Sequence, residues 1–72
     1  MTMDRVKRGQ KFKIDSIPDR VVRAQATRFG IAEGSVVVCE EVVPAGPVVI
    51  RNNKQLLALG RNLARRIRVA LT

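Results

Sequence analysis

The sequence has no histidine, tryptophan or tyrosine, and only one cysteine and two phenylalanines among its 72 residues. The single cysteine, Cys39, excludes an internal disulfide bond, and the lack of histidine excludes a closed zinc site, which takes four Cys or His ligands. Hydroxyl nucleophiles such as Ser16 and Ser35 have no histidine to activate them. We therefore expect no catalytic residue, no metal site and no cofactor.

Acidic residues are also scarce, with six against 14 lysines and arginines. Only Glu40 and Glu41 are adjacent, and neighbours on a strand point to opposite faces. We interpret them as a solvated strand end that balances nearby arginines. The Gly30–Gly34 segment lacks the Gly-Lys-Ser/Thr of a phosphate loop. These patterns predict that the protein is not an enzyme.

What the sequence has in excess is positive charge, with a formal net charge of +8. Such charge favours an acidic protein surface or phosphates as partner, although it is often no more than a solvated surface. Barrels that read RNA usually add aromatic platforms, but Phe12 and Phe29 are both expected to face the core. Because of the charge, nucleic-acid binding by a small basic barrel remains the alternative hypothesis, although the lack of aromatic platforms makes it the weaker one. The basic residues form two clusters, near the C-terminus (Arg61, Arg65, Arg66, Arg68) and near the N-terminus (Arg5, Lys7, Arg8, Lys11, Lys13).

The chain is apolar enough to fold, since 46% of its residues are hydrophobic, and its length predicts a single domain over residues 1–72. No apolar run is long enough to cross a bilayer, and the charged N-terminal residues do not resemble a signal peptide. A lone cysteine fits a reducing compartment, so we expect a cytoplasmic protein with Cys39 buried as a small apolar residue.

The hydrophobic pattern predicts a mainly β fold with one short helix between the first and second strands. The helix begins at Pro18-Asp19, places Val22, Ala26 and Phe29 on one face, and ends at Gly30. Residues 5–9 are expected to form a lead-in turn and 61–65 a helical turn. Asn52-Asn53 is typical of a two-residue hairpin turn. Strands are expected at 11–17, 35–43, 48–51, 54–59 and 67–71, closing into a small five-stranded barrel without exposed edges.

Three segments in order resemble a known family. RAQATRFGIAEG (residues 23–34) is similar to its Arg-x-x-Leu-x-x-Leu-Gly-Leu/Met-x-Pro-Gly helix and turn, and VPAGPV (43–48) to its Pro-x-Gly-(Asp)-Pro turn. LAL (57–59) with ARRIRV (64–69) resembles its Ala-Leu-Arg…Ala-x-x-Ile-x-Val ending. The family is FeoA, ferrous iron transport protein A. The resemblance implies a small cytoplasmic SH3-like barrel.

The sequence departs from the family pattern at four places. Ala26 replaces a leucine, Glu33 replaces a proline, and the Asp before Pro47 is absent. Gly60 stands where the family usually has arginine, and Arg61 is the residue that could take over part of that role.

The resemblance also implies a non-catalytic adaptor that binds the cytoplasmic GTP-binding region of FeoB, the ferrous iron transporter, and supports Fe(II) uptake. Two residues have a structural alternative: Arg23 could bond a turn carbonyl or an acid of its own domain, and Phe29 could simply close the barrel. The helix end and the proline turn form the expected contact surface, and Arg65 and Arg66 are expected to steer association. The full set is Arg23, Arg28, Phe29, Ile31, Pro44, Gly46, Arg65 and Arg66.

Overall fold

The computed structural model describes all of residues 1–72 and contains five strands, a nine-residue helix and two shorter helical segments. In chain order these are η1 (Met3–Arg5), β1 (Lys11–Ser16), α1 (Arg20–Arg28), β2 (Val36–Val42), β3 (Val48–Asn52), β4 (Gln55–Leu59), α2 (Arg61–Ala64) and β5 (Arg68–Leu71).

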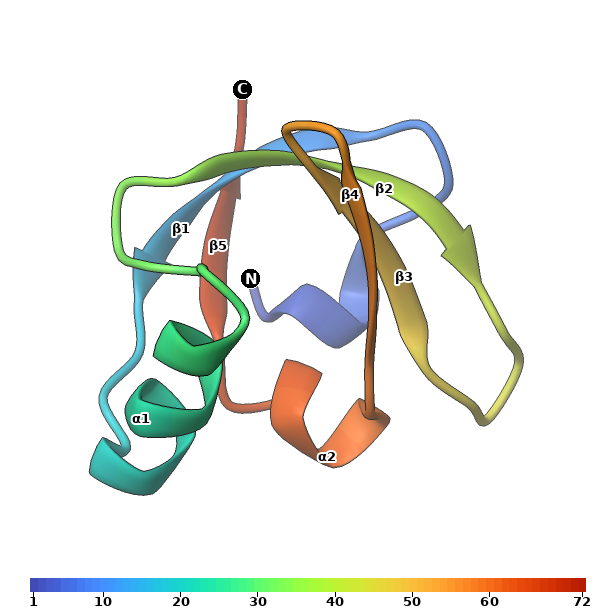
Figure 1. Ribbon diagram of the computed structural model, residues 1–72. Helices are drawn as coiled ribbons and strands as arrows, with labels where there is room; N and C mark the ends of the chain where they lie inside the picture. Colours follow the sequence, from blue (N-terminus) through green and yellow to red (C-terminus); the bar gives the residue numbers. More distant parts are fainter.

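The strands form one antiparallel sheet in the order β4-β3-β2-β1-β5, which curls round so that α1, α2 and η1 lie at its open side (Figure 1). The predicted five strands and the helix between the first two are confirmed. The expected closure is incomplete, because β4 and β5 remain the two ends of the sheet and do not pair. None of the helices is both long and apolar enough to span a bilayer.

β1 shows how the sequence sets the faces of the sheet. Phe12 and Ile14 are fully buried, while Lys11, Lys13 and Asp15, which alternate with them, are exposed. This is the alternation of a strand that covers a core on one side. The register with β5 shifts between Ile14 and Ser16, as a bulge does.

Sixteen residues, all hydrophobic, form one buried cluster, and Cys39 is among them as predicted. The N-terminal segment differs from the simple lead-in turn that the sequence predicted, because it contributes to this cluster. Met3 in η1 is fully buried and Val6 nearly so, and the Met3 N–H donates to Ile67 O at 2.9 Å. The N-terminal segment therefore fills the core where the sheet leaves a gap.

The β3–β4 hairpin turn lies one residue later than predicted. Asn52 pairs with Gln55, so the two turn residues are Asn53 and Lys54. Asn53 has φ 59°, the left-handed conformation that asparagine tolerates best among non-glycine residues. The positive φ belongs to the second asparagine alone.

Candidate functional site: a groove between the two helices

The groove starts at the N-terminus of α1, where Asp19 caps the helix. Its carboxylate accepts hydrogen bonds from the backbone N–H of Val21 at 2.8 Å and of Val22 at 3.2 Å. These bonds satisfy two of the donors that a helix start leaves without a partner. The other carboxylate oxygen accepts from Arg66 Nη1 at 3.0 Å. Asp19 thus connects the start of α1 to the turn after α2.

The C-terminus of α1 sets the far end of the groove. Gly30 is left-handed with φ 76°; its N–H donates to Thr27 O, and the Ile31 N–H donates to Ala26 O at 2.9 Å. This pair of bonds is the Schellman arrangement, in which the residue after the glycine turns back onto the helix. Ile31 is consequently buried, and Phe29 is left at the surface with 43% of its area exposed. The prediction that Phe29 faces the core was wrong.

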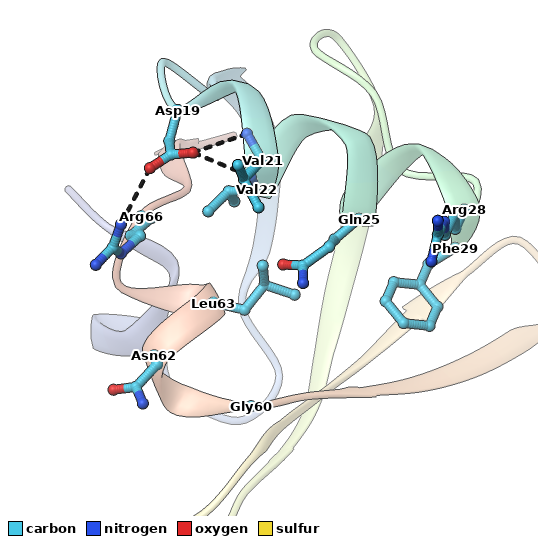
Figure 2. Close-up of a pocket in the computed structure, with 10 residues that line it drawn as sticks. All are labelled: Asp19, Val21, Val22, Gln25, Arg28, Phe29, Gly60, Asn62, Leu63 and Arg66. Carbon is cyan, nitrogen blue, oxygen red and sulfur yellow. Dashed lines mark hydrogen bonds and ion pairs between the residues drawn. The ribbon is translucent and has the colours of Figure 1, made fainter.

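Between these ends lies a groove of about 750 Å³, with α1 on one side and α2 on the other (Figure 2). Leu63 projects from α2 into the space below α1, Gln25 points down toward it, and Phe29 lies at the C-terminal end of the helix. Val21 lies at the opposite end and is 68% exposed. The lining is an apolar set (Val21, Val22, Phe29, Leu63) with a rim of charged and polar residues (Asp19, Gln25, Arg28, Asn62, Arg66) and Gly60.

The one acidic group of the groove is held in its charged form. Hydrogen bonds from the backbone N–H of Val22 and Val21, together with the charge of Arg66, keep the pKa of Asp19 below its ordinary value of 3.8. A carboxylate occupied in this way positions the helix and gives the rim a fixed ion pair.

We expect the stability contributed by this carboxylate to depend on pH. Because folding lowers the pKa of Asp19, its contribution is present above 3.8 and is lost as the pH falls through the folded-state pKa. Asp19→Asn keeps a capping oxygen but no charge, so it should melt below the wild type at neutral pH and approach it toward about pH 2. Thermal melts across this range measure the difference. Asp15→Asn, at an exposed site without such bonds, is the control; a pH-independent gap for Asp19→Asn would contradict the assignment.

Three of the residues predicted for the contact surface lie together in this groove, namely Arg28, Phe29 and Arg66. Two others have structural positions. Ile31 is fully buried, so its side chain offers nothing to a partner in this conformation. Arg23 donates from Nε and Nη2 to Ile17 O at 3.1 and 2.9 Å, which is the intradomain role left open for it above.

The remaining predicted residues lie outside the groove lining. Pro44 and Gly46 belong to the β2–β3 turn, where Gly46 O accepts from Arg61 Nε at 3.1 Å. A Cβ at position 46 would lie 2.8 Å from Val43 Cγ1, so any other residue here would force the Val43 side chain or the turn to shift. Arg65 is exposed directly after α2. A contact role for these residues remains a prediction.

Sequence reasoning missed Val21 and Leu63, which contribute most of the apolar lining together with Phe29. The available signal for Val21 was its position beside the buried stripe of Val22 and Ala26, where an exposed valine has no packing role. Leu63 gave no such signal, because a four-residue helical turn is too short to show a periodic face.

The arrangement suits contact with another surface better than chemistry. The only acid in the groove is bound by two N–H groups and an arginine, and no three Cys or acidic side chains of the chain gather where they could hold an ion. Phe12 is fully buried, so Phe29 is the only aromatic ring on which a base could stack. Side-chain stacking, the usual mark of single-strand recognition, thus has one platform here.

Comparison with known proteins assigns the chain to a family. The model of the FeoA domain matches residues 1–71. The chain belongs to the FeoA domain family. The resemblance found in the sequence is therefore confirmed. Among curated proteins, no sequence matches the chain significantly.

Solved structures share the fold of this FeoA domain protein. A crystal structure described as the iron uptake regulatory protein (FeoA) matches with a TM-score of 0.91 and 23% identity, covering 100% of this chain and 97% of that one. The solution structure of the FeoA protein of Chlorobium tepidum matches with a TM-score of 0.83 and 26% identity, covering 99% of this chain and 70% of that one. The structure of a FeoA-like protein of Clostridium acetobutylicum matches with a TM-score of 0.87 and 25% identity, covering 99% of this chain and 85% of that one. The predicted fold class is confirmed.

Membership of the FeoA family supports a role in ferrous iron transport and an association with the iron transport machinery. The family is one of small non-enzymatic domains. Glu33, which stands where the family often has proline, makes a structural contact. Its carboxylate accepts a hydrogen bond from the Ile17 N–H at 3.1 Å and lies 3.8 Å from Arg23 Nη2. The acid thus ties the turn after α1 to the end of β1.

Proposed function

We propose that this FeoA domain protein is a non-catalytic adaptor of ferrous iron uptake that binds the cytoplasmic GTP-binding region of a FeoB-like transporter. The groove between α1 and α2 is the docking site. The observation that carries the proposal is the groove itself, an apolar lining with exposed Val21 and Phe29 inside a rim that holds two arginines, on a chain of the FeoA family.

The physical character of the groove supports a protein partner. A half-exposed aromatic ring beside an apolar hollow is the usual form of an interaction hot spot, and arginine is enriched there with the aromatics. Arg28 carries no ion pair, whereas Arg66 is paired with Asp19 at one end of the groove. Arg28 is therefore the rim charge that is free to meet an acidic group of the partner.

The surplus charge supports rapid association with an acidic surface. A net charge of +8 on so small a protein creates a positive field that raises encounter rates at low ionic strength. Arg65 is exposed without an ion pair and is the better placed of the two predicted steering residues, because Arg66 is already engaged with Asp19.

Replacing Phe29 with alanine should weaken binding to the transporter's GTP-binding region by about tenfold or more, because an aromatic hot-spot residue contributes on the order of 2 kcal/mol. Calorimetry with that purified region, loaded in turn with GTP, GDP or no nucleotide, measures the dissociation constant. Thermal unfolding should change little, since the ring is exposed and lies outside the buried cluster.

Val36→Ala is the matched control, because Val36 is an exposed residue of β2 outside the groove, with 46% of its area accessible. It should leave both affinity and melting temperature unchanged. Absence of wild-type binding in every nucleotide state would remove the adaptor function. Binding that is equally tight for wild type and Phe29→Ala would remove the groove from it.

A further inference from the structure

The two ends of the sheet are treated differently by the chain. Beyond β5 the N-terminal segment adds hydrogen bonds: Val69 N–H donates to Met1 O at 2.8 Å, and Thr2 forms a bridge with Arg68. β4 pairs only with β3, and no other backbone or side-chain hydrogen bond reaches Gln55–Leu59. β4 is therefore the uncovered edge of the sheet.

The turn geometry identifies which backbone groups lie along this edge. In a hairpin with a two-residue turn, the residues flanking the turn form a hydrogen-bonded pair, here Asn52 and Gln55. Antiparallel pairs alternate along the ladder, so Leu57 and Leu59 also bond to β3. The N–H and C=O groups of Leu56 and Ala58 consequently point away from β3. They present two donors and two acceptors in a row.

Nothing in β4 blunts this edge. The strand contains no charge and no proline, and its register with β3 runs without a bulge. Natural proteins use such devices to protect exposed edges from pairing with another chain. Leu56 instead places an apolar side chain there with 57% of its area exposed, and Ala58 is exposed beside it. An edge in this state is suited to accept an additional strand.

Charge decides which kind of strand. The chain has a net charge of +8 and no acidic residue from Val42 to Thr72, and two basic residues adjoin β4: Lys54 in the turn before it and Arg51 opposite Leu56 in β3, which is paired with Glu40. A second copy would bring the same charges to the same edge and be repelled. An extended acidic segment would be attracted.

We propose that the free edge of β4 is a second interaction site, at which an extended acidic segment of a partner protein adds as a sixth strand. Hydrogen bonds to Leu56 and Ala58 give the register, Leu56 supplies an apolar contact, and Lys54 with the positive charge of the whole chain favours acidic side chains. The site uses different residues from the groove between α1 and α2 and does not depend on the partner proposed for that groove.

The test uses the whole protein and three short capped peptides. The first alternates glutamate and valine, the second replaces each glutamate with lysine, and the third is the acidic peptide with every second backbone nitrogen methylated, so that it cannot pair. We expect the acidic peptide to shift the amide resonances of Leu56 and Ala58 and to slow their hydrogen exchange about tenfold or more. The lysine and methylated peptides should do neither.

Ala58→Pro tests the same edge from the protein side. Proline removes the outward N–H without removing a bond to β3, which is where strands tolerate it. Ala58→Pro should lower the affinity for the acidic peptide about tenfold. Ala58→Val, which keeps the N–H, should bind the peptide as tightly as the wild type does. Four results would each overturn the proposal: the methylated peptide binds as tightly as the acidic one, the lysine peptide does so, the resonance shifts are confined to arginines, or β4 pairs between two copies of the protein. The peptide comparison remains a test even if Ala58→Pro fails to fold.

Discussion

Phe12→Ala is expected to leave most of the protein unfolded at physiological temperature. Phe12 is fully buried in the centre of β1, between Val37 of β2 and Leu71 of β5 in the register of the sheet. Truncating a buried phenylalanine costs about 3–5 kcal/mol. A core of this size rarely provides more than about 3–5 kcal/mol in total. The loss therefore equals the whole stability of the fold.

Circular dichroism melts and urea titrations measure this loss directly. Phe12→Leu keeps most of the buried volume and should retain a cooperative transition at a lower midpoint, so that a free energy can still be obtained. Val36→Ala on the neighbouring strand is an exposed control and should change stability by less than about 0.5 kcal/mol. A Phe12→Ala protein that melts close to the wild type would mean that the core repacks around the missing ring.

The features that the sequence predicted well are those determined within a few residues. The alternation of Phe12 and Ile14 in β1, the start of the helix near Asp19 and its end at Gly30 each depend on local geometry, and the structure has all three, with Asp19 as the cap before Arg20 and not as a residue of the helix. The proline-rich turn between β2 and β3 is local in the same sense.

The exchange of roles between Phe29 and Ile31 shows where a helical period stops being informative. The spacing of Val22, Ala26 and Phe29 continues one face of a helix, but α1 ends at Arg28 and the chain reverses at Gly30. After such a reversal, the residue that packs back on the helix is the one after the glycine. A pattern that includes the motif at the helix end, and not the period alone, would have placed Ile31 in the core.

The groove could not be derived from the sequence because it depends on where distant elements meet. Leu63 faces α1 only because the sheet brings α2 beneath that helix, and the pair of Asp19 and Arg66 joins residues 47 positions apart. The same holds for the uncovered edge of β4. In the closed barrel that the sequence predicted, β4 would pair with the last strand. In the structure the N-terminal segment bonds to β5, and β4 has no second partner.

Arg61 gives the second large effect, and it is an arginine that composition alone assigned to a charged surface. Its guanidinium donates from Nε to Gly46 O at 3.1 Å, from Nη2 to Val43 O at 3.1 Å and from Nη1 to Asp4 O at 3.4 Å. One side chain thus joins the start of α2, the β2–β3 turn and η1. Only the planar fork of arginine can reach three carbonyls in this way.

Arg61→Ala should destabilise the protein by about 2 kcal/mol, because hydrogen bonds from a charged donor contribute about 1.5–3 kcal/mol and these are partly exposed. Arg61→Lys keeps the charge but has one nitrogen, so it should recover only a small part of the loss. Urea unfolding gives the free energies, and amide exchange at Val43 and Gly46 reports whether the turn loosens. Arg65→Ala removes an exposed side chain that forms no hydrogen bond or ion pair, and it should leave both unchanged. Equal effects at the two positions, or full recovery by lysine, would show that charge, and not the three bonds, is what Arg61 contributes.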